Sequence, residues 1–320
     1  MMTYFPLLTI VIPVFNTANF LSRCLDSLIN QVNKKIEILL IDDCSTDNSL
    51  DIIKQYSKKY ANIDYISLTK QSGAGNARNL GLEKITTKYV CFLDSDDWID
   101  SYTYEKVIRF LENNQNCDIA LFGIKMEYDS PFVSKFKCNY EYSNIIESRY
   151  ALALLCKTIN YDLSISSMMG NKVFRTKLLK NKNIRFKHKY FEDVYFSFVS
   201  FFYAKYVCFI EDTYLHYYQR QNSIMHSFSR QYIDGLFDIL YDLRIFLDDD
   251  GCFIEYQKEY FALFNKCIYS LMNIIFSVNQ NDAIQKKYII YLVEILAKKF
   301  DITELIRNLD INVIKEIFSN

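Results

Sequence analysis

Short apolar runs alternate with amphipathic stretches along the first half of the chain. The apolar runs span residues 7–14, 36–41, 63–68 and 89–93. Apolar residues at helical spacing follow the first three runs, at residues 18–31, from about residue 47, and at residues 73–85. Nearly continuous apolar strands between helices predict an α/β fold, with a mostly parallel sheet that helices cover on both faces.

The second half of the chain has a different pattern. A strand is expected at residues 118–126, two helices within 171–204, and two short strands at 206–210 and 213–218. From residue 229 the spacing is helical, with breaks near Gly251 and residues 279–282. We therefore expect an α/β domain over residues 1–228 and a helical C-terminal extension over residues 229–320.

Composition narrows the class of protein. Of the 320 residues, 50% are hydrophobic and 23% are charged, which is typical of a globular chain, and the net charge of −1 argues against nucleic acid as a partner. No apolar run approaches the roughly 18 residues of a membrane span. The nine cysteines include no C-x-x-C pair, which favours reduced thiols in the cytoplasm.

Polar side chains follow the predicted strands at their carboxyl ends. Asn16 follows the first run, Asp42 and Asp43 end the second, and the acidic stretch Asp94–Asp97 follows the fourth. Ligands of open α/β sheets bind at this edge. Because neighbouring carboxylates repel, a site that gathers them usually holds a cation such as Mg²⁺ or Mn²⁺, which can bridge to substrate phosphates. Alone, each acidic residue is equally well explained as a solvated loop end or a helix cap.

Glycine patterns exclude two nucleotide sites. The turn after the first strand has no G-x-G-x-x-G sequence, and the chain has no P-loop. A glycine-rich stretch occurs instead at residues 73–81, where small residues allow close helix packing. Arg78 within it is suited to pair a phosphate or to order the acidic stretch.

Taken together, these motifs resemble the family 2 glycosyltransferases, inverting enzymes with the GT-A fold that include bacterial surface-polysaccharide and lipooligosaccharide transferases. The matching stretches are residues 9–16, 41–47, 73–81, 92–98, 191–193 and 218–224. Each motif is weak alone, but their order and spacing over residues 7–225 are specific. The resemblance implies a UDP-sugar donor, a glycan or lipid-linked glycan acceptor, and a divalent cation.

The resemblance also implies residue roles. The donor side comprises Pro13, Phe15, Asn16, Asp42, Asp43, Gly75, Arg78, Asp94, Ser95, Arg220 and Ser223. Among these, Asp43 or Asp42 contacts uracil, Asp94 lies near the ribose, and Arg220 and Ser223 lie near the diphosphate. Asp96 binds the metal and Asp193 is the catalytic base. An inverting transfer needs such a base, and a carboxylate in this position typically contributes about 10²–10⁴-fold.

Three residues carry weaker assignments. His226 is a second candidate metal ligand, although a lone histidine is more often structural. Trp98 is placed on the acceptor side, with core packing an equal alternative. Glu192 is also placed there, and with Asp193 it has the alternative role of a helix N-terminal cap.

Two other functions and the role of the C-terminal extension stay open at this point. A sugar-nucleotide pyrophosphorylase normally has a glycine-rich first turn, which is absent here, and a receiver-like regulatory domain also carries paired aspartates after a strand. Lysine pairs at residues 286–287 and 298–299 suggest an amphipathic helix on the inner face of the cytoplasmic membrane. A helical cap or an oligomer contact is the simpler interpretation.

Overall fold

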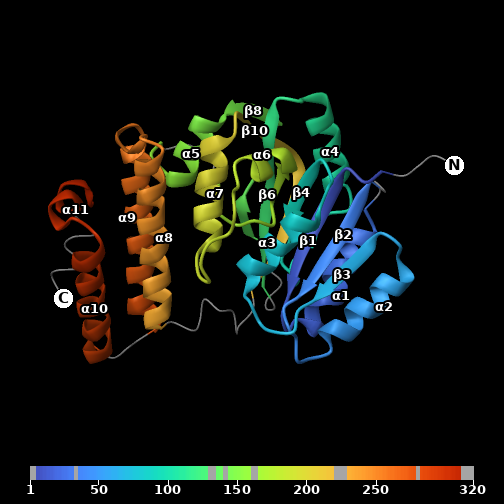
Figure 1. Cartoon of the computed structure of the whole chain (residues 1–320), viewed down its shortest axis with the longest axis horizontal. Helices are drawn as coiled ribbons and strands as arrows, with labels where there is room; N and C mark the ends of the chain where they lie inside the picture. The colour runs from blue at the N-terminus through green and yellow to red at the C-terminus, as the bar shows by residue number, and fades with distance from the viewer. Residues whose placement is uncertain are drawn as a thin grey trace.

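The computed structural model describes residues 5–31, 35–128, 135–139, 143–159, 165–219, 229–278 and 282–310. Within these residues the chain forms one mixed sheet flanked by helices, and the last helices stand side by side at one end of the molecule (Figure 1). The predicted α/β class with C-terminal helices is therefore confirmed.

The elements have the following bounds. The strands are β1 (Leu8–Val14), β2 (Ile36–Asp42), β3 (Ile63–Ser67), β4 (Tyr89–Phe92), β5 (Trp98–Ile99), β6 (Cys117–Glu127), β7 (Lys135–Cys138), β8 (Asn144–Glu147), β9 (Lys172–Arg175) and β10 (Tyr206–Tyr218). The helices are α1 (Ala18–Ile29), α2 (Ser49–Lys59), α3 (Ala74–Lys84), α4 (Thr103–Asn113), α5 (Ser148–Cys156), α6 (Thr176–Asn181), α7 (Glu192–Tyr203), α8 (Arg230–Asp249), α9 (Phe253–Val278), α10 (Asp282–Lys299) and α11 (Ile302–Asn308).

The sheet has the strand order β3-β2-β1-β4-β9-β6-β10-β5, with β7 beside β6 and β8 beside β10. Strands β3, β2, β1 and β4 are parallel. Strand β9 is antiparallel to both β4 and β6, so these two point the same way, and β10 is parallel to β6. The long strands therefore share one direction, and their carboxyl ends lie at the same edge of the sheet.

Strand β1 forms the centre of the core. All seven of its residues are buried, as expected for a strand covered on both faces. Helix α3 packs closely against it, because a Cβ atom on Gly81 would lie 2.3 Å from Cγ1 of Val11. Part of the glycine-rich stretch therefore serves helix packing, which was one of the two roles considered for it.

The prediction for residues 171–204 was partly wrong. Two helices are present, α6 and α7, but residues 172–175 form strand β9. Phe174 pairs with Val90 of β4 and with Ile119 of β6, so long-range pairing decides the conformation of this segment. Four residues are too few for periodicity to reveal a strand.

The two short strands predicted before residue 218 are a single irregular strand, β10. Its register against β6 shifts between Ile210 and Tyr214, and Asp212 in this interval has a φ of +48°. Gly123 lies opposite, where a Cβ atom would be 2.4 Å from the Tyr214 ring. The shift lets β10 continue to the carboxyl edge, where it pairs with β5.

The helices after residue 229 pack against one another and against helices α5 and α7 of the preceding domain. Helix α8 packs on α7, α9 and α10, and α5 packs on α9. Helix α8 ends at Asp249, and Gly251, directly after the C-cap residue Asp250, has a φ of +68°, as is common just after a helix. The other predicted break, at residues 279–282, falls mostly outside the described residues. None of the described helices is long and apolar enough to cross a membrane.

The contact between α3 and β1 predicts the effect of one added methyl group. Gly81→Ala should lower the free energy of unfolding by about 1–3 kcal/mol, since the new Cβ overlaps Val11 in a packed interior. Urea unfolding measures this change. The Val11→Ala/Gly81→Ala double variant should lose less stability than the sum of its single variants, and strict additivity would contradict the proposed overlap.

Candidate active site

The turns after β1 and β2 are joined at the carboxyl edge of the sheet. The backbone N–H of Asp43 donates to the carbonyl of Val14, 2.8 Å away. Asn16 has a φ of +52°, and its Oδ1 accepts from the backbone N–H of Thr46 at 2.8 Å. Both Asn16 and the preceding Phe15 are exposed, with Phe15 39% exposed. These two side chains are therefore accessible to a ligand at this edge.

Pro13, the remaining predicted residue of the first turn, lies inside strand β1. It is buried and pairs in register with Ile41 of β2. Pro13 can therefore contribute to a nucleotide site only indirectly, by directing the backbone toward Phe15 and Asn16.

Asp42 and Asp43 are buried, and both hold the surrounding loops. Asp43 accepts from the backbone N–H and hydroxyl of Ser72, at 2.7 and 2.8 Å, and from the backbone N–H of Gly73 at 2.7 Å. Asp42 accepts from the hydroxyl of Ser67 at 2.9 Å. A carboxylate has about four acceptor positions, so Asp43 can still accept one further bond from a ligand.

The acidic stretch after β4 is attached to three neighbouring elements. The Ser95 hydroxyl accepts from the hydroxyl of Thr17 at 2.9 Å, and the Asp96 carbonyl accepts from Arg23 at 3.1 Å. The Asp97 carboxylate accepts from the backbone N–H of Tyr218 at 3.0 Å. These contacts connect the stretch to the turn after β1, to α1 and to the end of β10.

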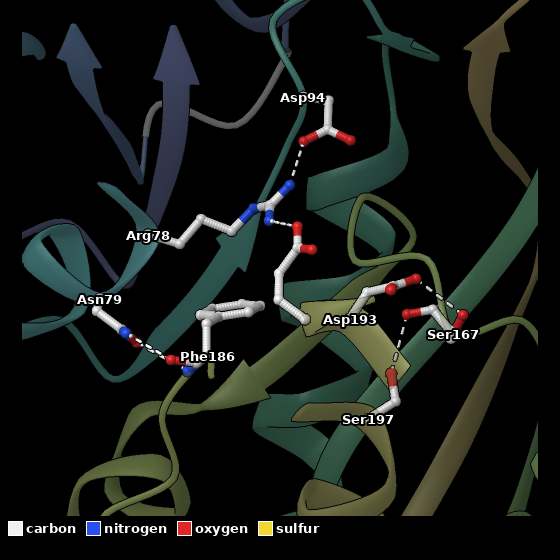
Figure 2. A network of polar contacts seen from close by, with 8 residues as sticks. Arg78, Asn79, Asp94, Ser167, Phe186, Asp193 and Ser197 are labelled. Atoms are coloured by element: carbon white, nitrogen blue, oxygen red, sulfur yellow. Dashed lines mark hydrogen bonds and ion pairs between the residues drawn. The ribbon is translucent and has the colours of Figure 1, made fainter. Parts of the chain in front are cut away.

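Arg78 links this acidic stretch to the start of helix α7. Its side chain is only 6% exposed, and its guanidinium donates to Asp94 at 2.6 Å (Figure 2) and to Glu192 at 2.8 Å. Burial alone would lower the pKa of Arg78, but the two carboxylates outweigh it and hold the pKa above its ordinary value. The guanidinium also lies 5.3 Å from the Phe186 ring. Arg78 thus joins the predicted donor side to the predicted acceptor side.

Gly75 lies where the segment before α7 passes over helix α3. A Cβ atom at this position would lie 3.3 Å from Cβ of Phe186 and 3.4 Å from Cγ of Glu192. The neighbouring Asn79 pairs through both amide atoms with the backbone of Phe186, each at 2.9 Å. The structure thus places Gly75 at the base of the Arg78 site, and a direct donor contact from it stays a prediction.

Glu192 is largely buried, and its environment alters its titration. Burial raises the pKa of Glu192, Arg78 lowers it and Asp193 raises it again, so that the pKa lies above its ordinary value. Both acidic residues occupy the first turn of α7, where the helix dipole stabilises negative charge.

Asp193 is held by a residue that the sequence did not indicate. The hydroxyl of Ser167 donates to Oδ2 of Asp193 at 2.8 Å, and the hydroxyl of Ser197 donates to the carbonyl of Ser167 at 2.9 Å (Figure 2). Ser167 is 26 residues from Asp193 and lies in no recognisable motif. Only the folded chain brings Ser167 to the predicted base, and Ser197, one helical turn after Asp193 on α7, holds Ser167 in place.

Trp98 packs between the side chains of His216 and Arg23. Its ring stacks on His216, with centroids 5.0 Å apart and planes 7° apart, and the Arg23 guanidinium lies 3.9 Å from its centroid. His216 contacts Glu127 at 2.7 Å and Asp100 at 2.9 Å. Trp98 therefore has a packing role, and its contact with an acceptor stays a prediction.

The C-terminal helices reach the segment that carries Glu192 and Asp193. Phe191, directly before this pair, has a φ of +57°, which is an unfavourable conformation for a large side chain. The ring of Tyr232, on α8, lies 4.6 Å from the ring of Phe191, and Tyr232 is 4% exposed. Helix α8 thus holds the start of α7 in place.

Three predicted donor or metal residues, Arg220, Ser223 and His226, lie outside the described residues. Within the described part of the chain, no group of three or more His, Cys, Asp or Glu side chains is arranged to hold a metal ion. The acidic stretch is nevertheless accessible, since the Asp94 side chain is 41% exposed.

The contact between Tyr232 and Phe191 predicts a catalytic effect from a residue of α8. Tyr232→Ala should lower kcat by up to about 10²-fold, because small displacements of a catalytic group are costly, while the Kd for UDP stays unchanged. Tyr232→Phe should retain near-normal kcat, since the ring contact remains. Steady-state kinetics and calorimetry measure both.

Phe237→Ala is the matched control for this prediction. Phe237 is a fully buried aromatic residue of the same helix and packs on Phe264 and Phe300 instead. If Phe237→Ala and Tyr232→Ala lower kcat equally, the effect is general loss of packing and the positioning role of Tyr232 is wrong.

The position of His216 between two carboxylates predicts a pH-dependent stability. Burial lowers the pKa of His216, but Asp100 and Glu127 raise it by more, so the folded pKa lies above the unfolded value of about 6.5. The charged imidazole therefore stabilises the fold fully below about pH 6.5, and this contribution disappears as pH rises through the folded pKa. The stability lost in His216→Gln should be largest at low pH and should shrink with rising pH. A loss of stability that does not change with pH would contradict a stabilising role for these ion pairs.

Comparisons with known proteins identify the family of the chain. A family model described as glycosyl transferase family 2 matches residues 9–176, more than half of the chain. Over 121 residues the chain is 45% identical to the poly(ribitol-phosphate) beta-glucosyltransferase of Bacillus spizizenii, covering 37% of this chain and 19% of that protein. It is 26% identical over 258 residues to the putative glycosyltransferase EpsH of Bacillus subtilis, covering 79% and 73% of the two chains.

A solved structure shares the fold. The S. aureus protein TarS, residues 1–349, in complex with UDP, superposes with a TM-score of 0.67 at 22% identity, over 90% of this chain and 80% of that one. This likeness confirms the GT-A arrangement. The chain spans only about a fifth of the Bacillus spizizenii relative, so that relative's overall activity does not transfer directly. The family match sets aside the pyrophosphorylase and receiver alternatives. The chain belongs to glycosyl transferase family 2.

Proposed function

We propose that this glycosyltransferase moves a sugar from a UDP-sugar to a hydroxyl group of a cell-surface glycan, with inversion at the anomeric carbon. The observation that carries the proposal is the Arg78 bridge, which brings the acidic stretch of Asp94 beside the Glu192–Asp193 pair. One group can thus hold the nucleotide diphosphate while the other faces an acceptor. TarS, which shares the fold, has been solved with UDP and with UDP-GlcNAc.

The donor would bind along the turns after β1, β2 and β4. The exposed Phe15 and Asn16 border the nucleotide, and Asp43 accepts a bond from the uracil N–H in addition to its loop contacts. Asp94 and Ser95 face the ribose. Because Arg78 is already paired with two carboxylates, its role is to hold these two groups in position before the donor binds.

The residues present suit a divalent cation, Mn²⁺ or Mg²⁺. Such an ion commonly takes only one or two protein carboxylates and completes its coordination with water and substrate phosphates, so a cluster of three protein ligands is not required. Asp96, with the accessible Asp94 beside it, would hold the ion. When bound, the ion offsets the negative charge that builds on the departing diphosphate.

Asp193 would act as the base in a single displacement. It accepts the proton of the acceptor hydroxyl, whose oxygen attacks the anomeric carbon from the face opposite the diphosphate. The bond from this carbon to the diphosphate oxygen breaks, and UDP leaves with the electron pair. An α-linked donor therefore yields a β-linked product. The hydrogen bond from Ser167 fixes the carboxylate for this step.

The acceptor class follows from the relatives and stays part of the proposal. They include proteins named for poly(ribitol-phosphate), teichuronic acid and minor teichoic acid, which are polymers of the bacterial surface. The same proposal places the enzyme in the cytoplasm, where its nine free cysteines would stay reduced.

Two substitutions separate donor binding from the chemical step. Asp96→Ala should weaken UDP binding in the presence of Mn²⁺ and abolish turnover. Asp193→Asn should leave UDP binding intact and lower transfer by about 10²–10⁴-fold, because only the base is lost. Titration calorimetry with UDP and a UDP-release assay measure the two effects.

Two results would contradict the proposal. UDP binding by the unmodified protein that does not depend on a divalent ion would remove the role of Asp96. Equal loss of UDP affinity in both variants would remove the assignment of Asp193 as the base. Thermal stabilisation by a panel of UDP-sugars with Mn²⁺ identifies the transferred sugar.

A further inference from the structure

A hollow of about 250 Å³ lies between helices α8 and α10, outside the site described above. Its lining consists of Arg230, Lys286, Lys287, Ile290, Tyr291 and Glu294. Three of these six side chains are cationic and one is acidic. The concentration of positive charge is unusual here, since the chain as a whole has a net charge of −1.

Among the residues that the structure describes, Arg230, Lys286 and Lys287 form no ion pair, although other basic residues of the same helices do, as Lys299 does with Asp238. All three are exposed. The three cations outnumber Glu294, the acidic residue of the hollow, so like charges repel one another there, and an anion in the hollow would relieve this repulsion.

Arg230 is positioned by its neighbours. Its guanidinium lies 4.7 Å from the ring centroid of Tyr291. The hydroxyl of Tyr291 donates to Asp234 at 2.7 Å, so this ring is held by a carboxylate one helical turn from Arg230. A guanidinium that is fixed over an aromatic ring keeps its N–H groups directed for paired contacts with phosphate oxygens.

Helix α8 separates the hollow from the predicted acceptor side. Tyr232, two residues after Arg230, packs on Phe191 beside the Glu192–Asp193 pair. Helix α8 contacts both α7 and α10, and Figure 1 shows it standing between them. A helix with its side chains is about 10–12 Å wide, so a chain of a few sugar units can reach from Asp193 to the hollow.

We propose that this hollow binds a phosphate group of the acceptor, and hence that the acceptor is a phosphate-bearing glycan chain that passes from Asp193 across the start of α8. The inference rests on the proposed function and narrows it to one class of acceptor. The phosphate contacts hold the chain, while Asp193 acts on a hydroxyl group further along it. The exposed lysines supply attraction that salt weakens, and Arg230 supplies the directed contact.

The test compares two triple variants with the same change in net charge. The first, Arg230→Glu/Lys286→Glu/Lys287→Glu, reverses the charge of the hollow. The control, Lys58→Glu/Lys59→Glu/Lys177→Glu, alters exposed lysines of α2 and α6, away from the hollow. Lys287→Glu alone is a milder second variant. The probes are a poly(ribitol phosphate) oligomer and an uncharged dextran oligomer of similar length.

Binding of the phosphate oligomer, measured by calorimetry without donor, should weaken roughly 10-fold or more in the first variant and little in the control, because three charge-assisted contacts are lost. With donor present, KM for the oligomer should rise while kcat at saturation and the Kd for UDP stay unchanged. The affinity of the unmodified protein should fall with salt. Any weak binding of dextran should be the same in all variants.

Other outcomes would overturn the inference. Equal weakening in both triple variants would show a diffuse charge effect, and an unchanged KM would show that the hollow does not take the acceptor. Loss of binding to phosphatidylglycerol vesicles with normal oligomer binding would assign the hollow to a membrane. Since the oligomer is titrated without donor, failure of UDP binding would count against the proposed function and leave this test intact.

Discussion

The candidate site depends on one buried cation between two carboxylates. Arg78 is withdrawn from water, and this is tolerated only because Asp94 and Glu192 lie within hydrogen-bond distance on either side. Removing either carboxylate would leave a buried guanidinium N–H group without its acceptor, and removing Arg78 would leave the two carboxylates without their shared cation, so the three groups hold each other in place. Through them, helix α3, the turn after β4 and the start of α7 become one rigid unit, although Glu192 is 114 residues from Arg78.

The segment before α7 is held from two sides. Arg78, on α3, pairs with Glu192 where α7 begins, and Tyr232 packs on Phe191 from α8. This double support explains how Phe191 keeps its positive φ, which costs free energy that the surrounding contacts must offset. The C-terminal helices thus contribute to the geometry of the predicted base, and their role is wider than that of a cap over a finished domain.

Several residues combine a structural contact with a predicted contact to substrate. Asp43 orders the start of the loop before α3, yet has an acceptor position left for a ligand. Trp98 rests on His216 and Arg23 at the border of the acidic stretch. The two interpretations that the sequence allowed for such residues, loop support and ligand contact, are therefore compatible. A side chain that is held by the protein loses less conformational entropy when it binds a ligand.

The sequence by itself determined the strand and helix order of the first half, the family, and the acidic residues at the carboxyl edge, because apolar periodicity and local motifs depend on neighbours in the chain. It did not determine strand β9, the contact of Ser167 with Asp193, or the packing of Tyr232 on Phe191. Each of these joins segments that are distant in the chain and carry no local signature. Only the tertiary structure decided these contacts, because strand pairing and side-chain burial depend on which distant segments the fold brings together.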